Sequence, residues 1–229
     1  MRIAGYQPLT LLDFPGRVAS TVFTQGCPFR CAYCHNPELL PMTGGAMDQE
    51  EVLARISRRS GFIDGVCVTG GEPTVQPDLP EFLARIKALG LAVKLDTNGL
   101  HPKMVGSIIE RGLVDYVAMD LKHVWRRYGE VIGPVAASAA DNCRATQALL
   151  ASSGVPHEFR TTVWPASHSE EGLLEIADGL EPGCRYALQE MRYGKTLQPD
   201  LARSAPTDLE AVGERIRAMR PDLRLEIRA

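Results

Sequence analysis

The sequence predicts an α/β fold that forms a partial (β/α)6 TIM-like barrel, and two patterns lead to this prediction. Short apolar runs that favour strands alternate with amphipathic segments that favour helices, at intervals of roughly 20–30 residues. Such alternation predicts parallel strands joined by helices that pack on the sheet. Polar or glycine-rich segments follow several of the strands, at the end where these folds carry their chemistry. Six such units are too few to close an eight-stranded barrel.

Seven runs are predicted to be strands because they are short and rich in β-branched, aromatic and other apolar residues. In chain order they are Val18–Thr24, Asp64–Gly70, Leu91–Thr97, Val114–Asp120, His157–Val163, Cys184–Glu190 and Leu223–Arg228. The first leads into a cluster of cysteines, and the next three end in polar motifs. Because the carboxyl ends of parallel strands meet at one edge, we expect these motifs to converge.

Six segments between the strands have the apolar spacing of helices. They are Asp48–Ser60, Asp78–Gly90, Pro102–Gly112, Ser138–Gly154, His168–Leu180 and Pro206–Met219. Asp48 is predicted to be an N-cap, with Glu51 three residues later. Gly90, Gly112 and Gly154 are predicted to end their helices, since glycine readily adopts the left-handed conformation found there.

Length and composition predict one domain over residues 1–229, with a core at about 15–200 and a helix–strand extension at 205–229. The formal net charge of -3 gives no basic surface typical of nucleic-acid binding. No apolar run approaches the roughly 20 residues of a membrane span. The first residues lack the apolar segment of a signal peptide. We therefore expect a cytoplasmic protein that binds neither nucleic acid nor membrane.

Three of the six cysteines, Cys27, Cys31 and Cys34, lie together in QGCPFRCAYCHNPEL, and His35 follows directly. Clustered cysteines in a cytoplasmic protein indicate metal ligands or catalytic groups. The segment contains the C-x-x-C-H pattern of haem attachment, which leaves Cys27 unexplained. A zinc site would need His35 as a fourth ligand beside Cys34. Three thiolates without a fourth also fit an iron–sulfur cluster with one iron left open.

The spacing Cys27-x3-Cys31-x2-Cys34, with aromatic Tyr33 before the last cysteine, resembles the signature of the radical S-adenosylmethionine (SAM) superfamily. The segment Gly70–Pro73, GGEP, resembles its second motif. Three further segments, DTNG, DLK and EFRTTVWP, are similar to the activating enzymes of glycyl-radical enzymes. Within that group the similarity is greatest to the activating proteins of anaerobic ribonucleoside-triphosphate reductases, followed by those of pyruvate formate-lyases. The resemblance spans roughly residues 10–200.

This resemblance implies a partial barrel of the radical SAM type and a [4Fe–4S] cluster held by Cys27, Cys31 and Cys34. The fourth iron would chelate the amino and carboxylate groups of SAM. One electron from the cluster would cleave SAM to methionine and a 5'-deoxyadenosyl radical, which would abstract hydrogen from a glycine of a partner. The implied partner is a glycyl-radical enzyme, with anaerobic ribonucleotide reductase as our expectation. A protein of the flavodoxin or ferredoxin type is expected to donate the electron.

The resemblance also implies roles for residues around SAM. Tyr33 would lie near the adenine. Gly70 and Gly71 would let the backbone approach SAM closely, as residues without a Cβ can. Glu72 would support this loop or the methionyl amine.

Four charged residues complete the expected cofactor site. Asp96 and Asp120 would bind a monovalent cation beside the SAM carboxylate, because a hard cation takes oxygen ligands. Lys122 would contact SAM or the partner's backbone. Arg160 would reach a SAM carboxylate or ribose.

One position departs from the pattern of the relatives. The pyruvate formate-lyase activating enzyme uses a histidine near its sixth strand for cofactor contact, whereas the comparable segment here offers Gln189, Glu190 and Arg192. That role therefore has no assigned residue.

Asp13, in LLDFPGR, is expected beside the substrate entrance, where it would contact the partner's glycine loop.

Two other functions remain open from the sequence. A radical SAM enzyme that acts on a small molecule, for example in synthesis of a deazapurine precursor, would share the cysteine and GGEP motifs. A non-enzymatic protein that binds a metal or transfers electrons would share the cysteines, but the GGEP and DTNG segments do not favour it.

Overall fold

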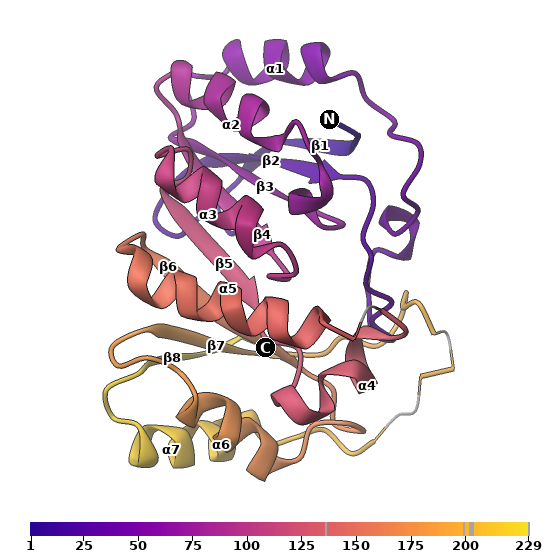
Figure 1. Ribbon diagram of the computed structural model, residues 1–229, viewed down its shortest axis with the longest axis vertical. Coiled ribbons are helices and arrows are strands. Elements are labelled where there is room, and N and C mark those ends of the chain that lie inside the picture. Colours follow the sequence, from indigo (N-terminus) through magenta and orange to yellow (C-terminus); the bar gives the residue numbers. More distant parts are fainter. Residues whose placement is uncertain (136, 199, 202–203, 229) are drawn as a thin grey trace.

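The computed structural model describes residues 1–135, 137–198, 200–201 and 204–228, which form one eight-stranded sheet flanked by helices (Figure 1). The strands are β1 (Ile3–Thr10), β2 (Ala19–Thr24), β3 (Gly65–Gly70), β4 (Ala92–Thr97), β5 (Tyr116–Asp120), β6 (His157–Val163), β7 (Arg185–Glu190) and β8 (Arg224–Arg228). Their order in the sheet is their order in the chain. Strands β2 to β8 are parallel, and β1 pairs antiparallel with β2.

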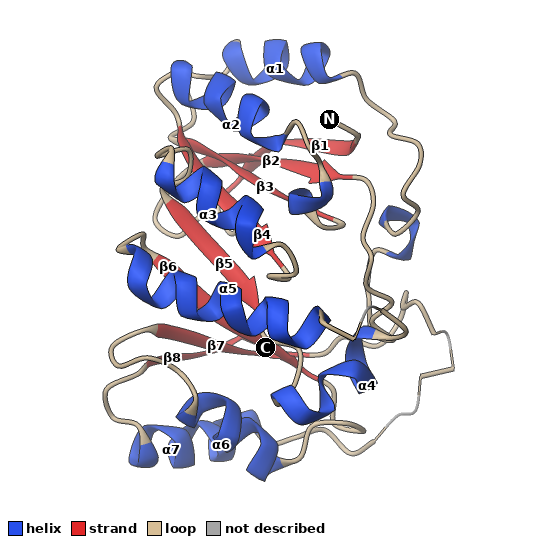
Figure 2. Cartoon of the chain, viewed as in Figure 1, coloured by secondary structure: helices blue, strands red, loops and turns tan. Residues whose placement is uncertain are grey.

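Helices connect the parallel strands and follow one another around the outside of the curved sheet (Figure 2). The α-helices are α1 (Gln49–Ser57), α2 (Leu79–Ala88), α3 (Pro102–Glu110), α4 (Tyr128–Ile132), α5 (Ala139–Ser153), α6 (Glu170–Asp178) and α7 (Leu209–Met219). Three 3-10 helices are η1 (Pro37–Leu39), η2 (Pro73–Val75) and η3 (Trp125–Arg127). This open parallel sheet with outer helices confirms the predicted partial barrel.

All seven predicted strands and all six predicted helices are present among the described residues. The capping predictions are also confirmed, since the Asp48 carboxylate accepts a hydrogen bond from the Glu51 N–H at 3.0 Å. Gly90, Gly112 and Gly154 have φ values of 77°, 65° and 72°. Strand β8 extends the same sheet, and the predicted division between core and extension stays a prediction.

Strand β1 and helix α4 were not predicted. Pro8 interrupts the β1 sequence, and the segment Gln7–Leu9 is exposed, so the run lacks the apolar signal of a buried strand. At the edge of the sheet β1 can include a proline without loss of a hydrogen bond between central strands. Helix α4 has five residues, too few for a helical period to show.

The two faces of the sheet differ in chemistry. Apolar residues of the strands, such as Val66, Val93 and Val117, belong to a large buried cluster that includes the inner faces of the helices. The opposite face, inside the barrel, has a small apolar cluster toward the amino ends of the strands: Phe14, Ala19, Ala92, Tyr116 and Ala118. Side chains at a spacing of two along a strand lie on the same face. Lys94 and Asp96, which follow Ala92, and Asp120, which follows Ala118, therefore share this interior face.

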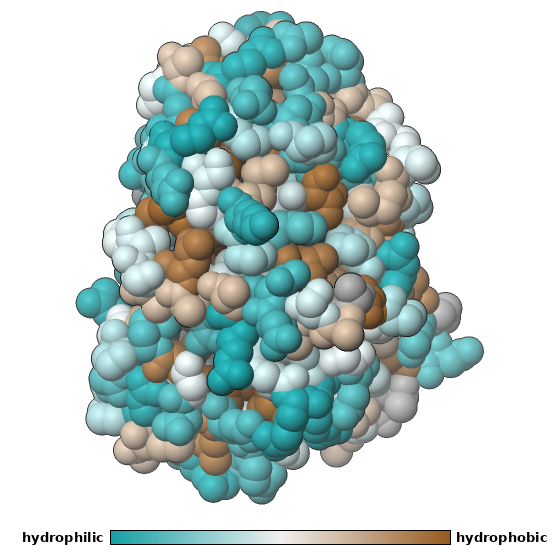
Figure 3. All heavy atoms as spheres, viewed as in Figure 1, coloured by the Kyte–Doolittle hydropathy of each residue, from teal (hydrophilic) through white to brown (hydrophobic). Residues whose placement is uncertain are grey.

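The outer surface is mixed in polarity. In the view of Figure 3, hydrophilic residues cover most of the helical face, and apolar residues form scattered patches. Within the described part of the chain, no helix has the length and apolarity needed to cross a membrane.

Candidate functional site

The cysteine-bearing loop leaves the carboxyl end of β2 and is held by its own backbone and by Arg30. The Gly26 N–H donates to the Leu39 carbonyl at 2.7 Å, and the Arg30 guanidinium donates to the Cys27 carbonyl at 2.6 Å. Cys27 and Cys31 are buried, and Cys34 is partly exposed. These hydrogen bonds fix the backbone that carries the three thiols.

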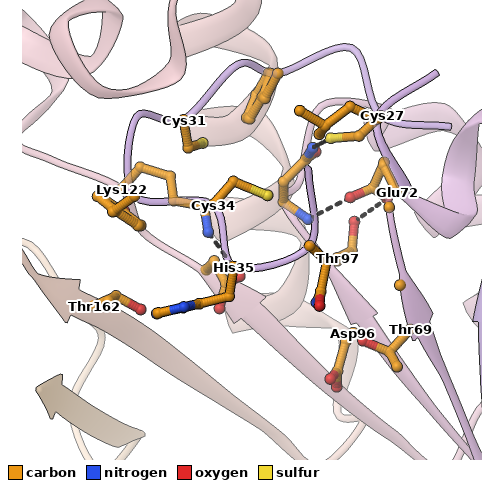
Figure 4. Close-up of a pocket in the computed structure, with 18 of the residues that line it drawn as sticks. Cys27, Cys31, Cys34, His35, Thr69, Glu72, Asp96, Thr97, Lys122 and Thr162 are labelled. Atoms are coloured by element: carbon orange, nitrogen blue, oxygen red, sulfur yellow. Dashed lines mark hydrogen bonds and ion pairs between the residues drawn. The ribbon is translucent and has the colours of Figure 1, made fainter. Parts of the chain in front are cut away.

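The loop covers a cavity of about 250 Å³, which we call the cysteine cavity (Figure 4). All eleven residues predicted for the cofactor site line it: Cys27, Cys31, Cys34, Tyr33, Gly70, Gly71, Glu72, Asp96, Asp120, Lys122 and Arg160. In Figure 4 the three cysteines lie on the loop side, and Thr69 and Asp96 lie on the opposite side, at strand ends. The predicted convergence is therefore present, and the individual roles stay predictions.

The donor atoms of this cavity fit an iron–sulfur cluster. Three thiols line one side, and the Asn98 amide lies 3.8 Å from the Cys27 sulfur, which suits an N–H···S contact that tunes a cluster. Burial raises the pKa of Cys27 to about 12 and that of Cys31 to about 11. Among the described residues no three histidine, cysteine or acidic side chains are placed to share one metal ion. A cluster does not require such a group, because each thiolate binds a different iron.

Gly70 and Gly71 allow the GGEP loop to approach the cysteine loop. Gly70 has a φ of 110°, and a Cβ there would lie 2.4 Å from the Thr24 nitrogen. A Cβ on Gly71 would lie 2.3 Å from the Gly26 carbonyl oxygen. The Gly71 N–H donates to the Thr24 carbonyl at 2.9 Å. The close approach that the structure records is thus to the protein backbone, while both glycines also line the cavity.

Glu72 is buried, and its carboxylate connects two strand-end loops. It accepts hydrogen bonds from the Thr97 hydroxyl at 2.7 Å, the Asn98 N–H at 2.6 Å and the Thr74 N–H at 3.1 Å. Burial outweighs these donors and raises its pKa. Because protein donors occupy the carboxylate, the structure favours the first of its two predicted roles, support of the loop.

The four predicted charged residues form an ion-pair chain with Lys94, in the order Lys94, Asp96, Arg160, Asp120, Lys122. The Lys94 ammonium pairs with the Asp96 carboxylate. Arg160 reaches Asp96 at 3.4 Å and Asp120 at 2.9 Å, and Lys122 reaches Asp120 at 2.8 Å. Positive and negative groups alternate from the barrel interior to the edge of the cysteine cavity.

The ion-pair chain keeps its members charged despite burial. Burial alone would raise the pKa of Asp96 and Asp120, but Arg160 and its lysine neighbours outweigh it and hold both values below the ordinary range. Burial would also lower the pKa of Lys122 and Arg160, and the carboxylates raise both instead. The cavity thus presents a cationic ammonium and guanidinium near the thiols at neutral pH.

Three aromatic side chains bear buried polar atoms without a hydrogen-bond partner among the described residues. They are the Tyr33 and Tyr116 hydroxyls and the Trp164 indole N–H, and of the three only Tyr33 lines the cysteine cavity. The Tyr33 and Trp164 rings meet edge to face, with their centroids 6.3 Å apart. Because buried polar atoms in native proteins are nearly always paired, the Tyr33 hydroxyl suits a ligand with polar edges in this cavity. The three thiols fit a cluster, and the orphaned Tyr33 hydroxyl fits a polar ligand such as SAM beside it.

A second, larger cavity of about 670 Å³, which we call the barrel cavity, adjoins the first. The two share His35, Asp96, Arg160 and Thr162. The remaining lining residues come from the segments after β1 and β7 and from β4, β6, β7 and β8: Leu12, Asp13, Pro15, Lys94, Glu158, Arg185, Gln189, Glu190, Arg192, Glu226 and Arg228. Residues from near both edge strands line it, so it lies toward the open side of the barrel.

The barrel cavity contains several residues that the sequence left without a cofactor role. Asp13 accepts a hydrogen bond from the Thr21 hydroxyl at 2.6 Å and lines this cavity, and its place at the substrate entrance stays a prediction. Gln189, Glu190 and Arg192 line the barrel cavity and are absent from the lining of the cysteine cavity.

Sequence reasoning gave no role to Lys94 or Asn98 and weighed His35 as a zinc ligand. Lys94 and Asp96 stand two apart on a strand, and this spacing places them on one face, so the pair was detectable. Asn98 is part of the recognised DTNG segment. His35 is exposed and lines both cavities. His168 is buried, and its Nε2–H donates to the Lys122 carbonyl at 2.9 Å while Nδ1 accepts from the Trp164 N–H at 3.0 Å; no local pattern marks it.

An open parallel barrel with a three-cysteine loop and a polar cavity at the carboxyl ends of its strands is the architecture of an enzyme that uses an iron–sulfur cluster and SAM. Residues 21–175 match the Radical SAM superfamily, and the chain belongs to this family. The family implies a [4Fe–4S] cluster and SAM as cofactors.

Within this superfamily the chain is similar to activating enzymes of glycyl-radical enzymes. It is 32% identical over 198 residues to the "Putative glycyl-radical enzyme activating enzyme MJ1227" of Methanocaldococcus jannaschii, covering 82% of this chain and 79% of that protein. It is 36% identical over 129 residues to the pyruvate formate-lyase-activating enzyme of Clostridium pasteurianum, covering 54% of this chain and 53% of the relative. The chain thus spans about half the length of the second relative.

Solved structures share the fold. Streptococcus suis SuiB bound to S-adenosylmethionine superposes with a TM-score of 0.70 at 16% sequence identity. The match covers 90% of this chain and 48% of SuiB. At this identity the likeness concerns the fold alone.

Proposed function

We propose that this protein activates a glycyl-radical enzyme, with anaerobic ribonucleotide reductase as the expected partner. One observation carries the proposal: the cysteine cavity, whose residues fit the cluster and SAM, shares four lining residues with a larger cavity on the unclosed side of the barrel. A polypeptide loop can enter from that side and bring a glycine toward the shared residues Asp96 and Arg160. The similarity to MJ1227 over most of both chains supports the same conclusion.

The proposed division of labour follows from the geometry. Cys27, Cys31 and Cys34 hold the cluster, and Lys122 and Arg160 provide positive charge for the SAM carboxylate. The Tyr33 hydroxyl is available to the polar edges of the nucleoside. When bound, the reduced cluster supplies one electron that cleaves SAM and so generates the radical that removes hydrogen from the glycine. Glu72 holds the GGEP and DTNG loops together so that the walls of the site do not move.

A flavodoxin- or ferredoxin-type protein as electron donor and a cytoplasmic location are part of this proposal. The monovalent cation expected at Asp96 and Asp120 is not part of the proposal, because each carboxylate already contacts two protein cations.

The experiment is anaerobic reconstitution with iron and sulfide, followed by electron paramagnetic resonance with and without SAM. We expect a reduced [4Fe–4S] signal that SAM alters, and a glycyl doublet once the partner is added. A cluster that ignores SAM contradicts the radical SAM assignment for this site. A normal response to SAM without a glycyl doublet on any glycyl-radical enzyme of the same genome contradicts only the activase proposal.

The barrel cavity also supports a second candidate function, turnover of a polar small molecule. Its charged lining would suit such a substrate. The two functions differ in stoichiometry: an activating enzyme consumes about one SAM for each partner site, whereas a small-molecule enzyme forms product continuously with substrate present. Measuring 5'-deoxyadenosine against partner concentration separates them.

A further inference from the structure

Lys94 is a lysine inside the barrel whose side chain is only 3% exposed. It lies on β4, two residues before Asp96, so both side chains point to the interior. Its ammonium pairs with the Asp96 carboxylate, and the Cys67 sulfur lies 3.9 Å away. Because lysine is almost never buried without a partner, this pair is a built feature of the site.

The ion-pair chain has a net charge that follows from its members. Lys94, Arg160 and Lys122 contribute three positive charges, and Asp96 and Asp120 contribute two negative ones, which leaves a net charge of +1 (3 − 2). A monovalent metal ion would compete for the same carboxylate oxygens. It would also add a second uncompensated charge to a largely buried group, which is unfavourable.

We propose that the Lys94 ammonium takes the place of a monovalent metal ion beside Asp96, so that this protein binds SAM without Na⁺ or K⁺. The remaining positive charge of the ion-pair chain then complements the SAM carboxylate. Without Lys94 the net charge falls to zero (2 − 2), and a metal ion at Asp96 would restore it. This inference rests on the proposed binding of SAM in the cysteine cavity.

The test measures the dissociation constant of SAM for the reconstituted holoprotein by anaerobic calorimetry. Two buffers of equal ionic strength contain KCl or tetramethylammonium chloride, because the organic cation is too large and apolar to replace K⁺ among carboxylate oxygens. The readout is the dissociation constant in tetramethylammonium chloride divided by that in KCl. We expect a ratio near one for the natural protein and about ten or more for Lys94→Met, with recovery as K⁺ is added.

Two variants test the charge argument directly. Lys87→Met is the control, because Lys87 also pairs with an aspartate, Asp115, at 2.7 Å, at a more exposed position away from both cavities. Its ratio should stay near one. The double variant Lys94→Met/Asp96→Asn keeps a net charge of +1 (2 − 1) and removes the oxygen that would bind the metal ion. Its ratio should return to near one.

A second readout needs no SAM. In the cluster-free protein, K⁺ should raise the unfolding temperature of Lys94→Met and leave that of the natural protein unchanged. If Lys94→Met does not fold, the test rests on the natural protein and Lys94→Arg. Both retain a cation at position 94, so both should have ratios near one. A ratio of ten or more for the natural protein, or a ratio near one for folded Lys94→Met, overturns the inference. Failure of the natural protein to bind SAM in either buffer overturns the proposed function and this inference with it.

Discussion

The two adjoining cavities differ in how far their charged groups are paired within the protein. In the cysteine cavity, Glu72 accepts several hydrogen bonds, and Asp96 and Asp120 each contact two cations. In the barrel cavity, Arg185 and Arg192 are exposed and have no ion-pair partner among the described residues. Polar groups held before the ligand arrives lose little order on binding, which suits a ligand of constant structure.

The difference indicates a division between cofactor and partner. The walls of the cysteine cavity are preorganised, as a site for cluster and SAM requires. The barrel cavity has a more exposed lining with unpaired charges, which suits contacts that a partner completes. Mutations in the first cavity should therefore impair every step, whereas those at the far side of the second should impair only partner activation.

The largest expected effect is loss of a cluster ligand. Cys31→Ala should abolish detectable activity, because the cluster would lose one of only three protein ligands. Iron and sulfide content and the visible absorbance of the reconstituted protein measure the loss. Cys184→Ala is the matched control, since Cys184 is also buried but lies outside both cavities. An intact cluster in Cys31→Ala would show that the loop holds it by another set of ligands.

Removal of the central cation of the ion-pair chain should have the next largest effect. Arg160→Met leaves Asp96 and Asp120 facing each other without the guanidinium between them. Loss of one partner from a largely buried ion pair costs about 3 kcal/mol of unfolding free energy. Urea unfolding of the cluster-free protein measures the change, and SAM affinity should fall as well. Arg126→Met, which breaks an exposed pair with Glu175, should leave both quantities unchanged.

An acid-sensitive contact behind the cysteine cavity should have a smaller effect. Burial lowers the pKa of His168 from 6.5 to about 4, and its ring stacks on His123 at 4.7 Å. The folded state thus favours neutral His168, so its contribution to stability is present above pH 6.5 and is lost as the pH falls toward 4. At pH 5.5 the loss should be about 1.4 kcal/mol relative to neutral pH.

Urea unfolding at pH 7.5 and 5.5 checks this prediction. Other groups also titrate in this interval, so the informative quantity is the difference between the natural protein and His168→Gln. The variant should lose less stability on acidification. Equal losses in the two proteins would show that His168 is not the responsible group.

The fold and the cysteine cavity were largely predictable from the sequence, for a physical reason. Each parallel strand carries its own apolar signal, and parallel order brings the strand ends to one edge, so local motifs were enough to collect Cys27, Gly70, Asp96 and Arg160 in one place. The pairing of charges was not predicted, although the Lys94–Asp96 spacing contained the signal.

The barrel cavity could not be predicted in the same way. Its lining comes from several strands and from the segment after β1, and no short motif links them. Strand β1 itself was missed because an edge strand with exposed residues and a proline has little apolar signal. Which exposed side chains border a cavity depends on the packing of the whole barrel.

Leu12 provides the smallest expected effect and the sharpest separation of the two cavities. It is 91% exposed and lines the barrel cavity beside Asp13, so a partner entering there would bury it. Leu12→Asp should raise the KM for the partner about fivefold, equivalent to about 1 kcal/mol, because a single contact at the border of an interface contributes little more. SAM affinity and the SAM-dependent change in the cluster signal should not change. Phe62→Asp, at an apolar residue that is 79% exposed and lies outside both cavities, should leave the KM unaltered. Equal effects of the two substitutions, or a change in SAM affinity with Leu12→Asp, would mean that partner and cofactor contacts are not divided between the two cavities.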